Sequence, residues 1–339
     1  MNILKIPIID PHAHLRDEEW SGKATMDQVA AEGKKVGIEH IFDMPNLPRP
    51  VISRQRVDER IQLARDRDIY DLYHLYVGLT ADPVQVLEAV DLVDQYDEVV
   101  GLKLFAGEST GDLAVADYEE QEAIYQTLSD AGYKEILAVH CEDQETIDND
   151  AWRFNSERPW TWADARSAIA ELFSVSNQIR IADDTDFKGK LQILHVSSKE
   201  TIYLIRQGIK KGLDIGIELT PHHTLYSVER LQDMGVKKAK NFKCNPSIKN
   251  EENRRGLWEY LHNLSPEDPL YYKTYIGSDY APHEPGAKQG DNPPSGIADY
   301  SLYNEFIKYA QNDAFSMEML KDLLHNNAIR RFDLDIELI

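Results

Sequence analysis

Cysteine and positive charge are scarce in this chain of 339 residues. Only Cys141 and Cys244 are present, in no CxxC pair, so a disulfide framework is not expected and both are interpreted as small buried packing groups. The 37 Lys and Arg residues are outnumbered by 59 Asp and Glu, for a formal net charge of −22. Such an acidic surface repels nucleic acid and anionic lipid, and an anionic substrate would need a local positive centre.

Long apolar runs are also lacking. No stretch of about 18 consecutive apolar residues occurs, which argues against a transmembrane helix. Residues 1–5 lack the apolar core and cleavage site of a signal peptide. Internal repeats, low-complexity segments and Gly/Pro/Ser-rich linkers are missing as well. We therefore expect one soluble, cytoplasmic domain over residues 1–339, with neither nucleic acid nor membrane as a partner.

What the chain does have is an alternation of short β-branched runs with longer amphipathic stretches. Strands are predicted at residues 6–10, 38–44, 71–77, 99–105, 136–140, 191–195, 214–219 and 272–278. Helices are predicted at 26–36, 53–65, 83–96, 118–131, 163–182, 199–211 and 251–261, with two terminal helices at 299–311 and 316–326. Eight such units predict an α/β fold of the (β/α)8 TIM-barrel type. An open doubly wound sheet is the alternative, but no GxGxxG follows the first strand.

Residues of the types that bind metals occur at the ends of five predicted strands. His12 and His14 end the first, and alternate residues of a strand point to the same side, so both can grip one metal. Lys103 lies inside the apolar fourth strand, where either its head reaches water or it is carbamylated and bridges two metals. The remaining three are His140, His195 and Asp279. This mixture favours zinc, and the carboxyl ends of barrel strands carry active sites.

Seven motifs extend this pattern from Asp10 to about Glu305. They are Asp10-Pro-His-Ala-His-Leu-Arg16, Met44-Pro-Asn46, Gly101-Leu-Lys-Leu-Phe105, His195-Val-Ser-Ser198, Glu218-Leu-Thr-Pro-His-His223, Cys244-Asn-Pro246 and Ser278-Asp-Tyr-Ala-Pro-His283. Together they resemble the amidohydrolase superfamily, and within it the dihydroorotases. The chain resembles a compact, barrel-only form, without room for the flanking β-sandwich of longer relatives. Those relatives often have Pro-Gly after the position of Arg16, where this chain has Asp17-Glu18.

The resemblance implies a binuclear site with two divalent metal ions, Zn2+ by preference. One ion would be held by His12, His14 and Asp279, and the other by His140 and His195, with carbamylated Lys103 bridging them. Asp279 would also be the catalytic proton carrier. The substrate would be contacted by Arg16, Asn46, Asn245 and His283 and by the loop at 293–297.

The implied activity is the reversible cyclisation of N-carbamoyl-L-aspartate to L-dihydroorotate in de novo pyrimidine biosynthesis. In this interpretation Arg16 grips the carboxylate of an anionic substrate; otherwise it forms a surface ion pair with Asp17 or Glu18. An allantoinase or hydantoinase, or a non-catalytic scaffold protein, remain alternatives. A homodimer and an association with aspartate transcarbamoylase are suggested partner relations that no sequence feature decides. His222 and His223 are expected to be structural, and Glu142 and Asp143 either orient ligands or cap a helix.

Overall fold

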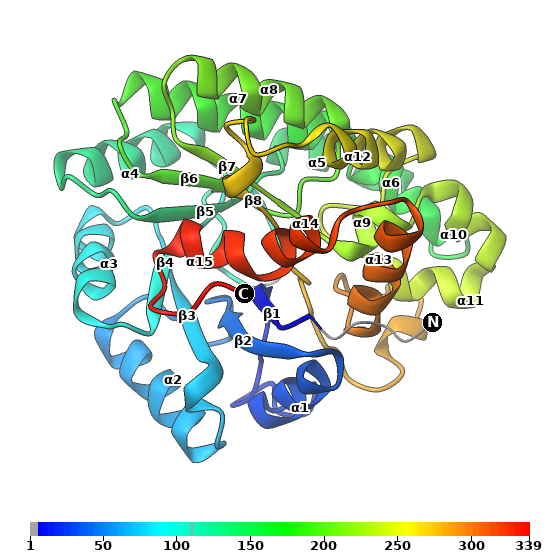
Figure 1. Cartoon of the computed structure of the whole chain (residues 1–339), viewed down its shortest axis with the longest axis horizontal. Coiled ribbons are helices and arrows are strands. Elements are labelled where there is room, and N and C mark those ends of the chain that lie inside the picture. Colours follow the sequence, from blue (N-terminus) through cyan, green and yellow to red (C-terminus); the bar gives the residue numbers. More distant parts are fainter. Residues whose placement is uncertain (1–5, 110) are drawn as a thin grey trace.

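Eight parallel strands form the centre of the computed structural model, which describes residues 6–109 and 111–339. The amino-terminal segment 1–5, judged above for signal-peptide character, lies outside the described residues. The sheet follows chain order from β1 to β8. Its strands are β1 Ile8–Ala13, β2 Ile38–Asp43, β3 Tyr73–Gly78, β4 Val99–Phe105, β5 Ile136–His140, β6 Lys190–Ile193, β7 Ile215–Leu219 and β8 Thr274–Ile276. The predicted barrel is confirmed (Figure 1).

The barrel closes just beyond the end of β8. Ala13 of β1 forms a parallel bridge with Tyr280, and the amide of His14 donates to the carbonyl oxygen of Tyr280 at 2.8 Å. The pairing of β1 with β2 shifts register between Asp10 and Ala13. This irregularity lies directly beside the His12–His14 segment, and bulges of this kind re-aim side chains near active sites.

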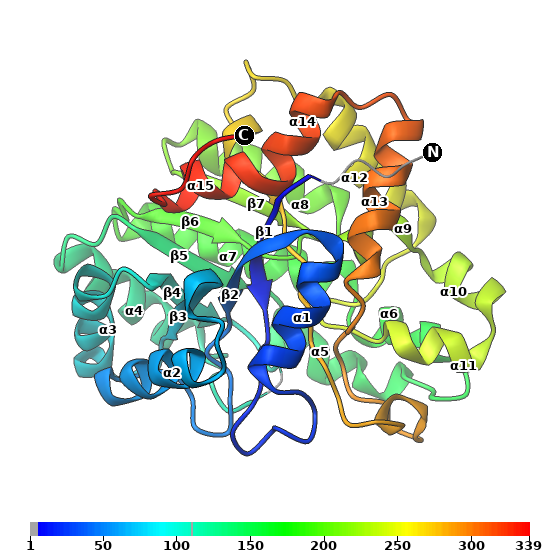
Figure 2. The same cartoon turned by 60° about the horizontal axis from the view of Figure 1, so that its bottom comes forward.

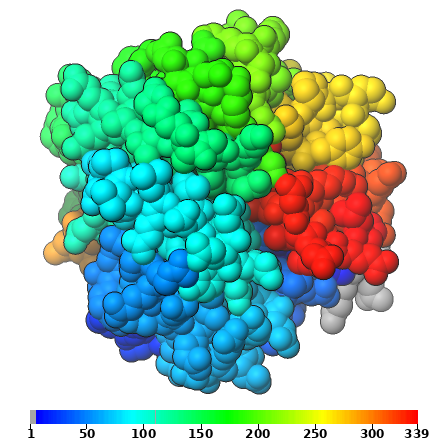
Figure 3. All heavy atoms as spheres, turned by 90° about the vertical axis from the view of Figure 1, so that its left-hand side faces the viewer, coloured from blue at the N-terminus to red at the C-terminus, as the bar shows by residue number. Residues whose placement is uncertain are grey.

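Amphipathic helices surround the barrel. The main ones are α1 Met26–Val36, α2 Arg54–Asp66, α3 Pro83–Gln95, α4 Tyr118–Asp130, α7 Ala168–Asp184, α8 Lys199–Lys210, α12 Glu251–Asn263 and α13 Ser301–Asn312. Shorter helices are α5 Gln144–Asp150, α6 Trp162–Ala165, α9 Pro221–Leu225, α10 Val228–Met234, α11 Val236–Ala239, α14 Met317–Lys321 and α15 Asn327–Phe332. Figure 3 shows one flank as a continuous wall from blue through cyan to green, with the red carboxy-terminal segment at its edge.

The predicted helix at 163–182 is wrong in one respect, because it is two helices. Arg166 leaves the helical conformation at φ −125° and ψ 74°, and Ser167 starts α7 in an extended conformation. The side chain of Arg166 is buried and bonds to Glu142, which follows β5. This contact between distant segments fixes the break. The predicted terminal helix at 316–326 consists of α14 and a π-helical turn, Asp322–Asn326, and the helical segment then extends beyond the prediction as α15.

The carboxy-terminal helices close one end of the barrel. Ile329 and Phe332 pack with Ile9, Phe42 and Tyr76 in one buried cluster, and the rings of Phe42 and Phe332 lie 5.0 Å apart edge to face. Figure 2 shows α14 and α15 at this end and the loops that follow the strands at the other. The open end is therefore the carboxyl end of the strands. Among the described residues no helix has the length and apolar character needed to cross a membrane.

Candidate metal centre and substrate pocket

His12, His14 and Asp279 converge at the open end of the barrel. Oδ1 of Asp279 lies 3.3 Å from Nε2 of His12 and 3.1 Å from Nε2 of His14. All three side chains are buried, and their ligand atoms form one of the groups that could hold a metal ion. Neighbouring donors around a tetrahedral zinc lie about 3.3 Å apart, because the Zn–N distance is about 2.0 Å. The three side chains therefore fit one divalent cation.

A second group contains His140, His195 and Lys103. Nδ1 of His140 lies 3.0 Å from Nε2 of His195, so the two imidazoles can share a cation. Lys103 is 1% exposed, and its Nζ has no hydrogen-bond partner within residues 6–109 and 111–339. Burial lowers the pKa of Lys103 to about 7. The sequence interpretation in which its head reaches water is therefore wrong.

Burial also keeps the histidines neutral. It lowers the pKa of His12 to about 3, against the opposing effect of Asp279, and it lowers the pKa of His140. Neutral imidazole is the form that offers a lone pair to a metal. The same burial raises the pKa of Asp279. The electrostatics of this cluster suit cation binding and oppose the protonation of its imidazoles.

In three of the four histidines, the ring nitrogen that faces away from the proposed cation position has a neighbouring side chain as partner; Nδ1 of His195 has none among the described residues. Nδ1 of His12 lies 2.7 Å from Oε1 of Glu218, Nδ1 of His14 lies 2.8 Å from Oδ1 of Asn46, and Nε2 of His140 lies 3.1 Å from Oε2 of Glu142. Such partners fix the orientation of metal-binding histidines. Glu142 thus takes the orienting role left open by the sequence, whereas Asp143 caps α5.

Glu218 is the functional residue that the sequence analysis passed over. Its Oε1 accepts both the Nδ1 proton of His12 and the backbone amide of His195, at 2.7 and 3.2 Å, so it ties the two groups together. Gly277 makes room for it, since a Cβ there would lie 2.7 Å from Cδ of Glu218. The available signal was a carboxylate inside the fully buried strand β7.

Three predicted site residues have left-handed backbone conformations. Arg16, His195 and Asp279 have φ of 58°, 38° and 48°. Non-glycine residues pay for this conformation, and such strain is concentrated at functional sites where the surrounding fold enforces it. The backbone therefore supports the same site that the side chains define.

A pocket opens beside the first group of ligands. His14, Arg16, Asn46, Asn245 and Asp279 line it, as do Ser109, Ala281, Ser295 and Gly296, which the sequence analysis did not name individually. Trp162 donates its indole N–H to Oδ1 of Asn245 at 3.1 Å. Because Ser295 and Gly296 belong to the predicted substrate loop at 293–297, that loop borders the pocket.

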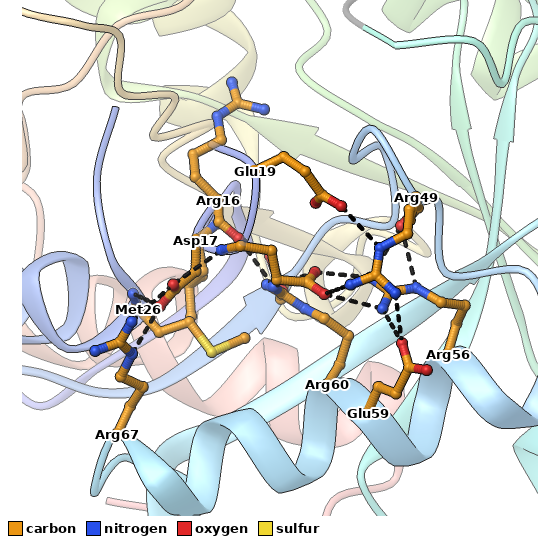
Figure 4. A network of polar contacts seen from close by, with 12 residues as sticks. Arg16, Asp17, Glu19, Met26, Arg49, Arg56, Glu59, Arg60 and Arg67 are labelled. Atoms are coloured by element: carbon orange, nitrogen blue, oxygen red, sulfur yellow. Dashed lines mark hydrogen bonds and ion pairs between the residues drawn. The ribbon is translucent and has the colours of Figure 1, made fainter. Parts of the chain in front are cut away.

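Arg16 lines this pocket and forms no ion pair with any residue that the structure describes. It is 1% exposed, and its Nε and Nη1 make no hydrogen bond to any described residue. Burial lowers the pKa of Arg16 to about 10, although Asp279 and Asp43 oppose the shift. Asp17 and Glu18 pair instead with other arginines, and Figure 4 shows the guanidinium of Arg16 turned away from that network. The alternative of a surface ion pair is wrong.

His283 is not among the residues that line this pocket, but it lines a neighbouring hollow that shares Gly296 with it, so its predicted contact with substrate stays a prediction. Its Nε2 donates to the carbonyl oxygen of Ser295 at 2.8 Å, and it packs so closely on Gly296 that a Cβ there would lie 2.6 Å from Nε2. In this conformation His283 is bonded to the loop that borders the pocket.

No protein-family model matches the chain. The allantoinase of Deinococcus radiodurans is 27% identical over 341 residues, covering 96% of this chain and 71% of the relative. The dihydroorotase of Methanosphaera stadtmanae is 26% identical over 98% of this chain and 72% of the relative. The chain is thus similar in sequence to allantoinases and dihydroorotases over nearly its whole length. The structure of L-hydantoinase from Arthrobacter aurescens has the same barrel, with a TM-score of 0.78 at 20% identity over 97% of this chain and 71% of that one.

Within the described residues, His222, His223 and Cys244 form a further cluster of metal-ligand types. Nε2 of His223 and Sγ of Cys244 each lie 3.1 Å from the carbonyl oxygen of Pro246, and Nδ1 of His223 lies 2.8 Å from Oγ1 of Thr220. Hydrogen bonds thus account for two of the three side chains. Both ring nitrogens of the buried His222 have no hydrogen-bond partner among the described residues, so the structural role expected for this segment stays a prediction. The expected burial of both cysteines is confirmed.

Proposed function

We propose that the chain is a dihydroorotase, which interconverts N-carbamoyl-L-aspartate and L-dihydroorotate in de novo pyrimidine biosynthesis. The observation that carries this proposal is the buried guanidinium of Arg16 beside His14 and Asp279, because its Nε and Nη1 have no hydrogen-bond partner and the group has no ion pair among the described residues. An unpaired buried charge is costly, and a substrate carboxylate would satisfy it through two parallel hydrogen bonds. A ring without a carboxylate would leave the charge unpaired.

Two divalent cations complete the proposed site. His12, His14 and Asp279 would hold one, and His140 and His195 the other. Lys103 would bridge them as a carbamate, since its amine has no hydrogen-bond partner in the described structure and its charge lowers the pKa of His12 and of His140, which belong to different groups. Zn2+ suits this set of imidazole and carboxylate donors. Such ions lower the pKa of water towards neutrality and polarise a carbonyl group.

Asp279 is the proposed proton carrier. Its carboxylate is at once within reach of His12 and His14 and on the wall of the substrate pocket. From there it would take the proton of the attacking water and deliver it to the amide nitrogen that leaves the ring. Ring closure would follow the same path in reverse.

A second candidate is an allantoinase or a hydantoinase. The identity to the allantoinase of Deinococcus radiodurans equals that to the dihydroorotase within one per cent, so sequence similarity favours neither activity. All six proposed ligand positions carry residues able to bind metal, which argues against a non-catalytic scaffold.

The test compares L-dihydroorotate, allantoin and hydantoin as substrates for the purified protein, before chelation, after it and after Zn2+ and bicarbonate are restored. The proposal expects chelator-sensitive turnover of L-dihydroorotate that is restored with the metal. Turnover of allantoin or hydantoin without turnover of L-dihydroorotate would assign the second candidate. A protein that holds two metals and hydrolyses none of the three acts on another ring.

A further inference from the structure

The chain turns through three successive left-handed residues as it leaves the metal site. Arg16, Asp17 and Glu18 have φ of 58°, 70° and 49°. None is glycine, and L-residues visit this region only singly and at an energetic cost. A run of three therefore has to be held by contacts from outside the turn. The side chains that hold it are the arginines of α2 and its flanks.

Arg60 and Arg67 donate hydrogen bonds to the first two residues of the turn. The buried Arg60 donates from Nη1 to the backbone carbonyl oxygen of Arg16 at 2.9 Å. Arg67 pairs with the Asp17 carboxylate through two bonds of 2.9 Å, and the same carboxylate accepts the amide of Met26 at 3.0 Å (Figure 4). The parallel bonds of a guanidinium fork fix both distance and orientation.

Glu18 anchors the far end of the turn. Arg56 donates from Nη2 to Oε2 of Glu18 at 2.7 Å, and Nη1 of Arg60 lies 3.2 Å from the same oxygen. Arg49 reaches the other carboxylate oxygen. All three turn residues thus have an arginine partner, while the guanidinium of Arg16 itself stays outside the network and points into the pocket (Figure 4).

We propose that Arg60 and Arg67 are positioning residues for substrate binding: they stabilise the left-handed turn that aims Arg16 into the pocket. The proposal rests on the proposed function, in which Arg16 binds a carboxylate. We call Arg60 and Arg67, with their bonds to the turn, the clamp. If the clamp is weakened, the turn can relax towards ordinary backbone conformations and move the base of the Arg16 side chain. His12 and His14 precede the turn and have their own partners, so the metal ligands should stay in place.

The experiment uses Arg67→Gln, because Arg67 is 36% exposed and its loss does not open the core. Arg65→Gln is the matched control, because it makes the same charge change two residues away. The Arg65 side chain is 50% exposed, and its ion pair with Glu98 is long, at 3.8 Å. For Arg67→Gln the expected result is a KM for L-dihydroorotate raised about tenfold, with kcat and bound metal unchanged. Arg67→Lys keeps the charge but not the forked pair of hydrogen bonds, so its KM should lie between those of wild type and Arg67→Gln.

A second measurement is independent of the substrate. Hydrogen exchange of the segment 17–26 should accelerate in Arg67→Gln and remain at the wild-type rate in Arg65→Gln, because the amides of Asp17, Trp20 and Met26 are bonded within the turn. Unchanged exchange in Arg67→Gln overturns the clamp whatever the substrate. Faster exchange with an unchanged KM in an active enzyme also overturns it, as does an equal loss of kcat and metal.

The two hypotheses fail separately. If wild-type protein hydrolyses no L-dihydroorotate, the proposed function is wrong, and binding of N-carbamoyl-L-aspartate by calorimetry replaces KM. Weaker binding by Arg67→Gln together with faster exchange supports the clamp. Equal binding by Arg67→Gln and wild type, or no binding by either, overturns the clamp as a positioning device for a carboxylate site.

Discussion

Replacing Arg16 with methionine should make the protein more stable and at the same time impair its binding of anionic substrates. The buried guanidinium has two nitrogens without hydrogen-bond partners among the described residues, and burial lowers its pKa from the ordinary arginine value to about 10. This shift corresponds to about 3 kcal/mol of unfavourable charge burial. Methionine keeps much of the apolar stem, and both residues pay the same cost for the left-handed backbone. We therefore expect the free energy of unfolding to rise by about 1–3 kcal/mol.

The effect on substrate has the opposite sign. Two charge-assisted hydrogen bonds to a carboxylate are worth at least about 3 kcal/mol together, so KM for N-carbamoyl-L-aspartate should rise about a hundredfold or more. Stability is measured by urea unfolding of metal-free protein, because bound metal adds its own stabilisation. Arg65→Met is the control, since Arg65 is half exposed on α2. Lower stability combined with an unchanged KM for Arg16→Met would refute the reasoning and make Arg16 a structural residue.

Three further predictions address the metal centre and the turn. Gly277→Ala places a Cβ 2.7 Å from Cδ of Glu218 and 3.1 Å from Cβ of His12, so metal affinity measured by chelator competition should fall about tenfold or more, and an unaltered affinity would contradict the packing argument. Native mass spectrometry should detect one added CO2 on wild-type protein and none on Lys103→Met, whose metal content should also fall. A wild-type mass equal to that of the unmodified chain would exclude the carbamate. Burial would raise the pKa of Asp17, but hydrogen bonds from Arg67 and Met26 outweigh it and lower the pKa. The stability advantage of wild type over Asp17→Asn should therefore be present above about pH 4 and vanish as the pH falls below that value, in urea titrations of metal-free protein; a constant difference would refute the ion pair.

The barrel and most of its elements could be predicted because their signals are local. Apolar runs and amphipathic periods marked all eight strands, and the predicted bounds of β4 and β5 coincide with those observed. The candidate ligands followed by the same logic, since the carboxyl ends of parallel strands meet at one mouth. His12, His14 and Asp279 are more than 260 residues apart at the extremes, yet their placement at strand ends sufficed to bring them together.

The details that fix the geometry of the site could not be predicted in this way. Arg16 is adjacent in sequence to Asp17 and Glu18, which made an ion pair among them plausible. In the fold, Arg67 and Arg56 take those carboxylates and leave Arg16 unpaired. The break after α6 has the same origin, because Arg166 departs from the helix and pairs with Glu142, which directly follows β5.

The sequence by itself thus determined which chemical groups this protein has and at which end of the barrel they gather, because strand periodicity and strand ends are properties of short segments. Only the tertiary structure decided how those groups are aimed. It placed Glu218 between the two histidine pairs, bonded His283 to the pocket loop, and held a left-handed turn with arginines on and beside α2. These arrangements depend on contacts between residues remote in the chain. The free-energy cost of burying a charge depends on the same contacts, so it cannot be predicted from a local sequence pattern.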